Sequence, residues 1–193
     1  MIDPTYLPPH LPQPVDDGAA DQLRGMVVPD VEMLASDGRR VRLDRADPAA
    51  SAGSALRTVV YAYPRTGRPG EPSLTDDWDL IPGARGCTPE SCAFRDHHGE
   101  LLAAGACVFG LSTQSRAYQR EAVERLRLPF ALLSDADLRF TTALALPTFQ
   151  AAGQTLLRRL TLVLRGGRVE HVFYPVFPPD RHAEEVVAWL SAR

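Results

Sequence analysis

One segment of the sequence says more about the fold than any other: Gly86-Cys87-Thr88-Pro89-Glu90-Ser91-Cys92-Ala93-Phe94-Arg95-Asp96. It predicts a helix to about residue 104, because Thr88 suits an N-cap and Pro89 suits the first helical position. Glu90 adds an acid in the first turn, where a helix favours one. Cys87 then lies just before the helix N-terminus, whose free N–H groups favour an anion. The pattern predicts a lowered pKa and a reactive thiolate.

The two cysteines of this segment lie five positions apart. In an intact helix that spacing is about 140° around the axis and ~7.5 Å along it, which separates the Cα atoms by roughly 8–9 Å. A disulfide needs less than about 7 Å. Cys87 and Cys92 therefore bridge only if the first turns unwind, which is typical of a redox switch. Two alternatives stay open: buried thiols on a core helix, and a zinc site that includes His97 and His98.

The segments on either side predict alternating strands and helices. Strands are expected at residues 58–63, 106–111 and 130–133, and a closing hairpin at 160–164 and 169–174. An earlier hairpin turns at Asp37-Gly38. Ser115 is expected to cap a helix to about residue 127, and Asp180 to cap a last helix. This order predicts an α/β layered domain.

Two stretches fall outside this pattern. Residues 1–24 are rich in proline and predict an extended arm, which leaves residues 25–193 as the domain. Residues 65–86 predict a long inserted loop, and long loops in compact domains usually serve a function. Its acids Asp76, Asp77 and Asp79 surround Trp78, so the loop is either simply solvated or a partner-contact surface.

Composition excludes several classes of function. The chain has 193 residues, enough for one domain, and its net charge of −3 favours neither nucleic acid nor a membrane surface. None of its 21 basic residues is lysine, which excludes phosphate-binding Walker lysines, Schiff-base lysines and Ser–Lys dyads. Three cysteines argue against a disulfide-rich secreted fold. With no apolar run of membrane-spanning length and no signal-peptide pattern, a cytoplasmic protein is expected.

The cysteine segment resembles the active-site helix of the peroxiredoxin Q family, also called bacterioferritin comigratory proteins. Further segments match in the family's order: Gly110-Leu111-Ser112, Pro129-Phe130-Ala131-Leu132-Leu133-Ser134-Asp135, Arg159-Leu160-Thr161-Leu162-Val163-Leu164 and Gly167-Arg168-Val169-Glu170-His171-Val172-Phe173. The resemblance covers roughly residues 26–190. The helix motif is its most specific part.

The resemblance implies a thioredoxin-like α/β fold, with a central mixed sheet flanked by helices, and a thiol peroxidase without a cofactor. Cys87 would be the peroxidatic thiolate that attacks hydrogen peroxide or a small organic hydroperoxide. Cys92 would resolve the sulfenic acid as an intramolecular disulfide, which a thioredoxin-like protein would reduce. Arg159 matches the family's active-site arginine and would stabilise the thiolate. Its neighbour Arg158 should point to the opposite face and meet solvent.

The active-site loop departs from the family's pattern of Pro, three residues, Thr and two residues before the cysteine. Tyr63-Pro64-Arg65-Thr66 resembles the start of that loop, but Cys87 follows Pro64 by 23 positions. The residue three before Cys87 is Ala84. The candidate substrate-binding residues are Pro64, Thr66 and Thr88, and Thr75 is a further candidate for the missing hydroxyl.

Two other functions stay open. A thiol–disulfide oxidoreductase is one, although the sequence lacks the Cys-x-x-Cys motif that such enzymes use. The other is a non-catalytic redoxin-fold module for binding or redox sensing, which the replacement of the family threonine by Ala84 favours. Nothing in the sequence marks an interface between copies, so a monomer and a homodimer are both expected possibilities.

Overall fold

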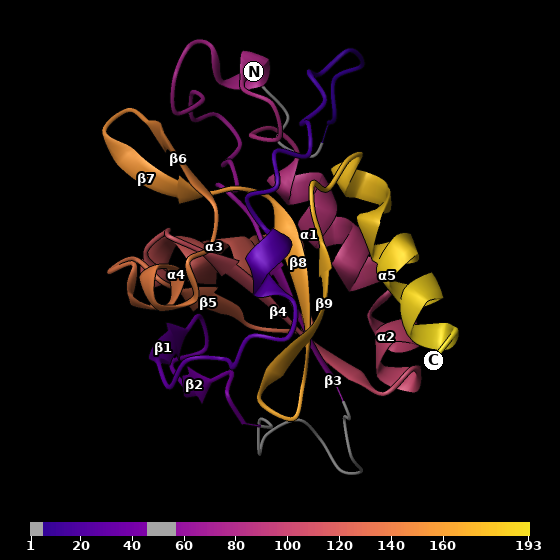
Figure 1. Ribbon diagram of the computed structural model, residues 1–193. Coiled ribbons are helices and arrows are strands. Elements are labelled where there is room, and N and C mark those ends of the chain that lie inside the picture. Colours follow the sequence, from indigo (N-terminus) through magenta and orange to yellow (C-terminus); the bar gives the residue numbers. More distant parts are fainter. Residues whose placement is uncertain (1–5, 46–56) are drawn as a thin grey trace.

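The computed structural model describes residues 6–45 and 57–193 (Figure 1). Within these residues a seven-stranded sheet has the order β2-β1-β5-β4-β3-β8-β9. Its strands are β1 Glu32–Ala35, β2 Arg40–Arg42, β3 Arg57–Ala62, β4 Ala106–Ser112, β5 Leu132–Ser134, β8 Leu160–Arg165 and β9 Arg168–Phe173. β3, β4 and β5 run parallel, whereas the other pairs are antiparallel. The predicted mixed sheet is confirmed.

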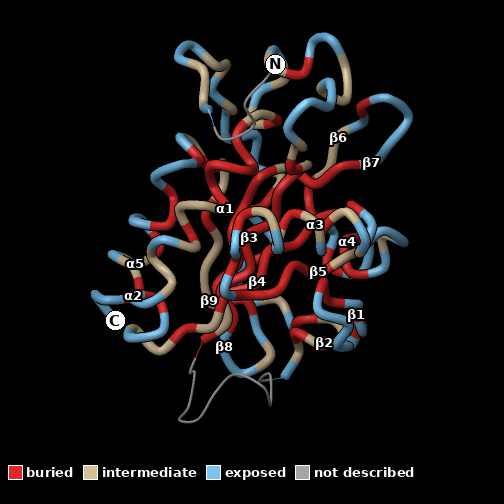
Figure 2. Tube along the Cα trace, turned by 180° about the vertical axis from the view of Figure 1, so that it is seen from behind, coloured by how far each residue is buried: buried red, intermediate tan, exposed pale blue. Residues whose placement is uncertain are grey.

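Helices cover both faces of this sheet. They are α1 Cys87–Asp96, α2 His98–Ala103, α3 Arg116–Leu126, α4 Arg139–Leu144 and α5 His182–Ser191. Successive residues of β3 point to opposite faces, so Val59 and Tyr61 pack with α1, α2, α3 and α5, whereas Val60 and Ala62 pack with α4. The central strand β3 is almost wholly buried (red in Figure 2), which explains why its residues after Arg57 are uncharged.

The α1 helix is fixed to the sheet by aromatic packing. The rings of Phe94 and Tyr61 are stacked with centroids 4.4 Å apart, and the Tyr61 hydroxyl donates to Ser91 Oγ at 3.2 Å. Gly86 precedes the helix with φ +105, and a Cβ there would lie 2.5 Å from Pro179 Cγ. Only glycine fits this conformation and this close approach. The packing therefore fixes where α1, and with it Cys87, begins.

The inserted loop and the N-terminal arm lie together at one end of the sheet (Figure 1). Apart from the short 3-10 helix η2, Trp78–Leu80, residues 65–86 form no regular element. Trp78 and Ala84 pack against Leu156 of a separate hairpin, β6 Thr148–Ala151 and β7 Gln154–Leu157. The arm reaches this loop, because Tyr6 O accepts a hydrogen bond from Arg85. The proposed boundary between arm and domain stays a prediction.

Two helix predictions were wrong at their starts. Gly86, not Thr88, is the N-cap of α1, because its positive φ turns the chain so that Cys87 is already helical. The same helix ends at Asp96, and α2 begins at His98 after a break, instead of one helix running to residue 104. Asp180 lies inside the 3-10 helix η3, Pro179–Arg181, so α5 begins at His182 without a side-chain cap.

Several short elements had no clear sequence signal. The α4 helix has six residues, too few for helical periodicity, and Asp135 fixes its start by accepting from the N–H groups of Phe140 and Thr141. β5 begins two residues later than expected, and the β6–β7 hairpin was not predicted. The remaining predicted strands, both hairpins and the Ser115 cap of α3 are confirmed.

No helix among the described residues is long and apolar enough to cross a membrane.

Candidate active site

Cys87 lies at the first position of α1 and is 2 % exposed. Its Sγ accepts a hydrogen bond from the Arg65 backbone N–H at 3.4 Å and from Arg159 Nη2 at 3.2 Å. As a thiol it donates to Ala84 O at 3.5 Å. Two donors therefore converge on the sulfur from parts of the chain far apart in sequence, which is the arrangement a thiolate needs.

Arg159 reaches this sulfur from the end of the sheet. It precedes β8, whose first residue Leu160 pairs with Ala62 at the end of β3. The side chain is 1 % exposed and donates to the carboxylate of Glu90 and to the carbonyls of Gly83 and Arg85, the latter two at 3.1 Å. These contacts hold the guanidinium rigidly beside Cys87. The predicted entry of Arg159 into the site is confirmed.

Arg158 points the other way, as predicted. Its side chain is 43 % exposed and pairs with Asp17 of the N-terminal arm at 3.3 Å. Neighbouring residues that lead into a strand alternate between its faces, so one arginine reaches the sulfur and the other the surface.

A small cavity of about 50 Å³ opens beside Cys87. Thr66 and Thr88 line it, so two of the three predicted substrate-binding residues are brought to the sulfur. Thr66 is held in place by Gln114, whose Oε1 accepts from the Thr66 N–H at 3.0 Å and from its hydroxyl at 3.1 Å. Pro64 is buried but does not line the cavity, whereas the next residue, Arg65, does.

The family's threonine position has no hydroxyl here. Ala84 is fully buried in the apolar cluster formed with Trp78 and Leu156. Thr75 does not line the cavity either, so Thr66 and Thr88 are the candidate threonines that lie there, together with the hydroxyl-bearing Ser73 and Tyr118. The 65–86 loop therefore uses Ala84, near its end, for packing, and places Thr66, near its start, beside the cavity.

Comparison with known proteins agrees with this geometry. A family model described as Redoxin matches residues 23–188. The chain belongs to the redoxin family. The predicted thioredoxin-like fold is confirmed by this match and by solved structures. Peroxidoxin BcpB from Mycobacterium tuberculosis has a TM-score of 0.66 and 26% identity, over 88% of this chain and 96% of its own.

The redoxin also resembles peroxiredoxins Q in sequence. The chloroplastic peroxiredoxin Q of Oryza sativa subsp. japonica is 29% identical over 170 residues, which cover 88% of this chain and 67% of its own. That of Sedum lineare is 32% identical over 135 residues, or 69% of this chain and 63% of its own. Xanthomonas campestris peroxiredoxin Q, at 24% identity and a TM-score of 0.63 over 85% of this chain and 91% of its own, shares the fold. The predicted resemblance to the peroxiredoxins Q is confirmed.

Burial dominates the acidity of the reactive thiol in this redoxin. It raises the pKa of Cys87, and the nearby Glu90 carboxylate raises it further, whereas Arg159 and the Arg65 N–H lower it. The lowered pKa predicted from the helix N-terminus is therefore wrong for this closed site. The sequence pattern locates the helix N-terminus, but it does not show that folding removes water from the sulfur and so raises the pKa of its thiol.

Cys92 stays apart from Cys87 on the same helix. None of the three cysteines forms a disulfide in the described part of the chain, and Cys87 and Cys92 lie within the unbroken α1. Cys92 is half-buried, which raises the pKa of its thiol, and Arg95 and Arg125 oppose that shift. Because Cys87 and Cys92 share this intact helix, their Cα atoms are separated by roughly 8–9 Å. A disulfide between the two cysteines therefore requires α1 to unwind at its start.

Glu90, Gln114 and the backbone of Arg65 were missed as site residues. Glu90 was assigned only to the first helical turn, but its fully buried carboxylate pairs with Arg159. A glutamate one turn after a reactive cysteine on the same helix lies near it, and that spacing was the available signal. Gln114 follows β4 in an ordinary polar turn, so no sequence pattern marks its contact with Thr66.

Replacing Glu90 by glutamine should lower the pKa of Cys87. The carboxylate charge raises that pKa, so its removal increases the thiolate fraction at neutral pH, while the amide oxygen still accepts from Arg159. In the wild type the rate of sulfur oxidation should rise about tenfold per pH unit until the thiol titrates. In the variant this profile should move to lower pH.

The measurement is the rate of Cys87 oxidation by peroxide against pH, together with the ultraviolet absorbance of the thiolate. Glu100→Gln is the matched control, because it removes the same charge from an exposed side chain of α2. A Glu90→Gln profile that stays in place or moves to higher pH contradicts the assigned role.

Proposed function

We propose that this redoxin is a thiol-dependent peroxidase that reduces hydrogen peroxide or small organic hydroperoxides without a cofactor. The observation that carries the proposal is the convergence of Arg159 Nη2 and the Arg65 N–H on Cys87 Sγ, beside a cavity large enough for a peroxide group. The relatives named peroxiredoxin Q support the same class of reaction. Cys87, Cys92 and Arg159 are its proposed catalytic residues.

In the first step the Cys87 thiolate attacks one oxygen of the peroxide. The S–O bond forms as the O–O bond breaks, the sulfur is oxidised to a sulfenic acid, and the peroxide is reduced to an alcohol or water. The leaving oxygen takes up the proton that the thiol lost. Arg159, with its two-pronged guanidinium, supports both the thiolate and the charge that develops on the oxygens.

In the second step Cys92 resolves the sulfenic acid. Its thiol attacks the Cys87 sulfur, an S–S bond forms as the S–O bond breaks, and water leaves. The start of α1 must unwind for this, and the contacts that hold it are those of Cys87 with Arg159 and of Tyr61 with Ser91. The proposed reductant is a thioredoxin-like dithiol protein, which returns two electrons to the disulfide.

The decisive experiment is stopped-flow Trp fluorescence of the reduced protein mixed with hydrogen peroxide, followed by peptide mapping of the product. Rapid, concentration-dependent oxidation should end in a Cys87–Cys92 disulfide. In Cys92→Ser the first phase should persist, but the product should be a sulfenic acid that dimedone traps, and turnover with thioredoxin should fall at least about tenfold. Oxidation at the pace of an ordinary thiol would contradict the proposal.

A non-catalytic redox-sensing module is the second candidate. Ala84 in place of a hydroxyl-bearing residue and the raised pKa of Cys87 both favour slow chemistry. The same stopped-flow trace separates the two functions, because a sensor forms the disulfide slowly and is not turned over by an excess of thioredoxin.

A cytoplasmic location is also part of the proposal. It is supported by the three cysteines, which form no disulfide in the described part of the chain, as a reducing compartment favours. The peroxiredoxins Q of Oryza sativa and Sedum lineare are chloroplastic proteins, and that location is theirs. The proposed partner is a thioredoxin-like reductant. The proposed oligomeric state is a monomer or a homodimer.

A further inference from the structure

The cavity beside Cys87 is more positive than hydrogen peroxide requires. Its lining includes three arginines, Arg65, Arg68 and Arg85, and one acid, Glu71. Hydrogen peroxide and simple alkyl hydroperoxides are neutral, so a cationic lining gives them no advantage over a polar one. The charge instead suits a substrate that carries an anionic group.

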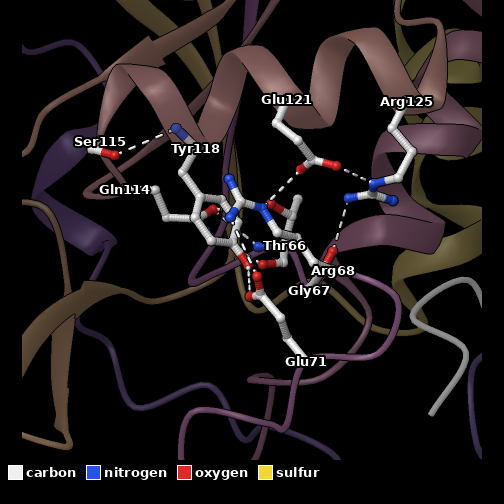
Figure 3. Close-up of polar contacts among 9 residues, drawn as sticks. All are labelled: Thr66, Gly67, Arg68, Glu71, Gln114, Ser115, Tyr118, Glu121 and Arg125. Atoms are coloured by element: carbon white, nitrogen blue, oxygen red, sulfur yellow. Dashed lines mark hydrogen bonds and ion pairs between the residues drawn. The ribbon is translucent and has the colours of Figure 1, made fainter. Parts of the chain in front are cut away.

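Arg68 is already neutralised by its neighbours (Figure 3). It pairs with Glu71 at 3.3 Å and with Glu121 of α3 at 3.1 Å, and Glu121 is shared with Arg125. Tyr118 adds to this network, because its hydroxyl donates to Glu71. A substrate anion would have to displace two carboxylates to reach Arg68, so this residue fastens the loop to α3 instead.

Arg85 is occupied in a similar way. Its guanidinium pairs with Asp79 at 3.5 Å and donates to Tyr6 O at 3.4 Å. The arginine therefore ties the inserted loop to the N-terminal arm. Its charge is compensated within the loop that precedes Cys87.

Arg65 differs from both. Its backbone N–H lies 3.4 Å from Cys87 Sγ, which places this residue directly beside the reacting atom. Its guanidinium lies over the Tyr118 ring, 4.7 Å from the centroid, and pairs with no carboxylate among the described residues. An aromatic face holds a cation in place but does not neutralise it. Among the described residues, the cavity thus has in Arg65 a positioned cation without a carboxylate partner.

We propose, on the basis of the proposed peroxidase function, that Arg65 selects short organic hydroperoxides that carry a carboxylate. The cavity of about 50 Å³ accommodates the peroxide group, and the rest of such a substrate extends along Leu74 and Trp78 toward Arg65. A carboxylate matches the two-pronged donors of arginine. The reaction is unchanged: the hydroperoxide becomes an alcohol that still carries its carboxylate, and Cys87 becomes a sulfenic acid.

The test compares a carboxylated analogue of tert-butyl hydroperoxide with its methyl ester, which differs essentially in charge. In the wild type at low salt the acid should oxidise Cys87 about fivefold faster than the ester, the effect of one partly exposed ion pair. The ratio should fall toward one as salt rises. In Arg65→Gln it should be about one at every salt concentration, and Arg65→Lys should restore part of it.

Taking the ratio within each variant cancels any change that a substitution makes to the sulfur itself. Arg120→Gln is the charge-matched control, because it removes an exposed arginine of α3 that does not line this cavity, and it should keep the wild-type ratio. A ratio of one in the wild type, or an unchanged ratio in Arg65→Gln, overturns the inference while hydrogen peroxide still oxidises Cys87. Failure of hydrogen peroxide as well would overturn the proposed function and this inference with it.

Discussion

Replacement of Cys87 by serine is expected to slow peroxide consumption at least about a thousandfold, because the enzyme loses its nucleophile. The serine hydroxyl is far less acidic than a thiol and cannot supply the anion at neutral pH. Its oxygen still accepts from Arg159 and from the Arg65 N–H, so the start of α1 should keep its structure. Peroxide consumption by the purified variant with excess reductant is the measurement, and circular dichroism checks the fold.

Cys107→Ser is the control for this experiment. Cys107 lies near the start of β4, where its sulfur is 3.3 Å from Thr58 Oγ1. The candidate site lies at the other end of the sheet, beyond the carboxyl ends of β3 and β4. This variant should consume peroxide at the wild-type rate. If Cys87→Ser also did so, the assignment of Cys87 as the peroxidatic residue would be wrong.

Replacement of Arg159 by methionine is expected to slow Cys87 oxidation by about 100- to 1,000-fold, the usual cost of losing a donor to a developing negative charge. Arg159 lowers the pKa of Cys87, so its loss should also raise that pKa and reduce the thiolate fraction further. The effect should therefore be larger at neutral than at alkaline pH. Single-turnover oxidation rates across the pH range give both parts of the loss.

The single variant leaves the buried Glu90 carboxylate without its cation, which typically costs about 3–5 kcal/mol of stability. The double variant Glu90→Gln with Arg159→Met removes that charge and should regain most of the stability. It should remain slow, because the donor to Cys87 is still absent. A folded double variant with the wild-type rate would show that Arg159 only balances Glu90.

Much of the fold was predictable from local patterns. The uncharged residues of β3 marked a strand buried on both faces, and Gly166-Gly167 marked the β8–β9 hairpin. Elements of three to six residues, such as β5 and α4, escaped prediction because they are too short for periodicity to accumulate. Their positions depend on tertiary contacts, as the hydrogen bonds from α4 to Asp135 show.

The candidate site divides in the same way. Cys87 and Cys92 were recognisable because they lie on one helix, and Arg159 because its position before a strand limits it to one of two directions. The pairing of Arg159 with Glu90 joins residues 69 positions apart, and the support of Thr66 by Gln114 joins residues 48 apart. No local pattern encodes such contacts.

The sequence by itself determined the reactive helix, the spacing that prevents its cysteines from bridging without unwinding, and the alternation that aims one arginine inward. These properties depend on covalent geometry and on hydrogen bonds between residues a few positions apart. Only the tertiary structure decided the acidity of Cys87, the use of Ala84 for packing and the position of the Arg65 charge over Tyr118, away from any carboxylate of the described residues. Those depend on how much water is excluded and which distant charges come together, and both follow from the packing of the whole chain.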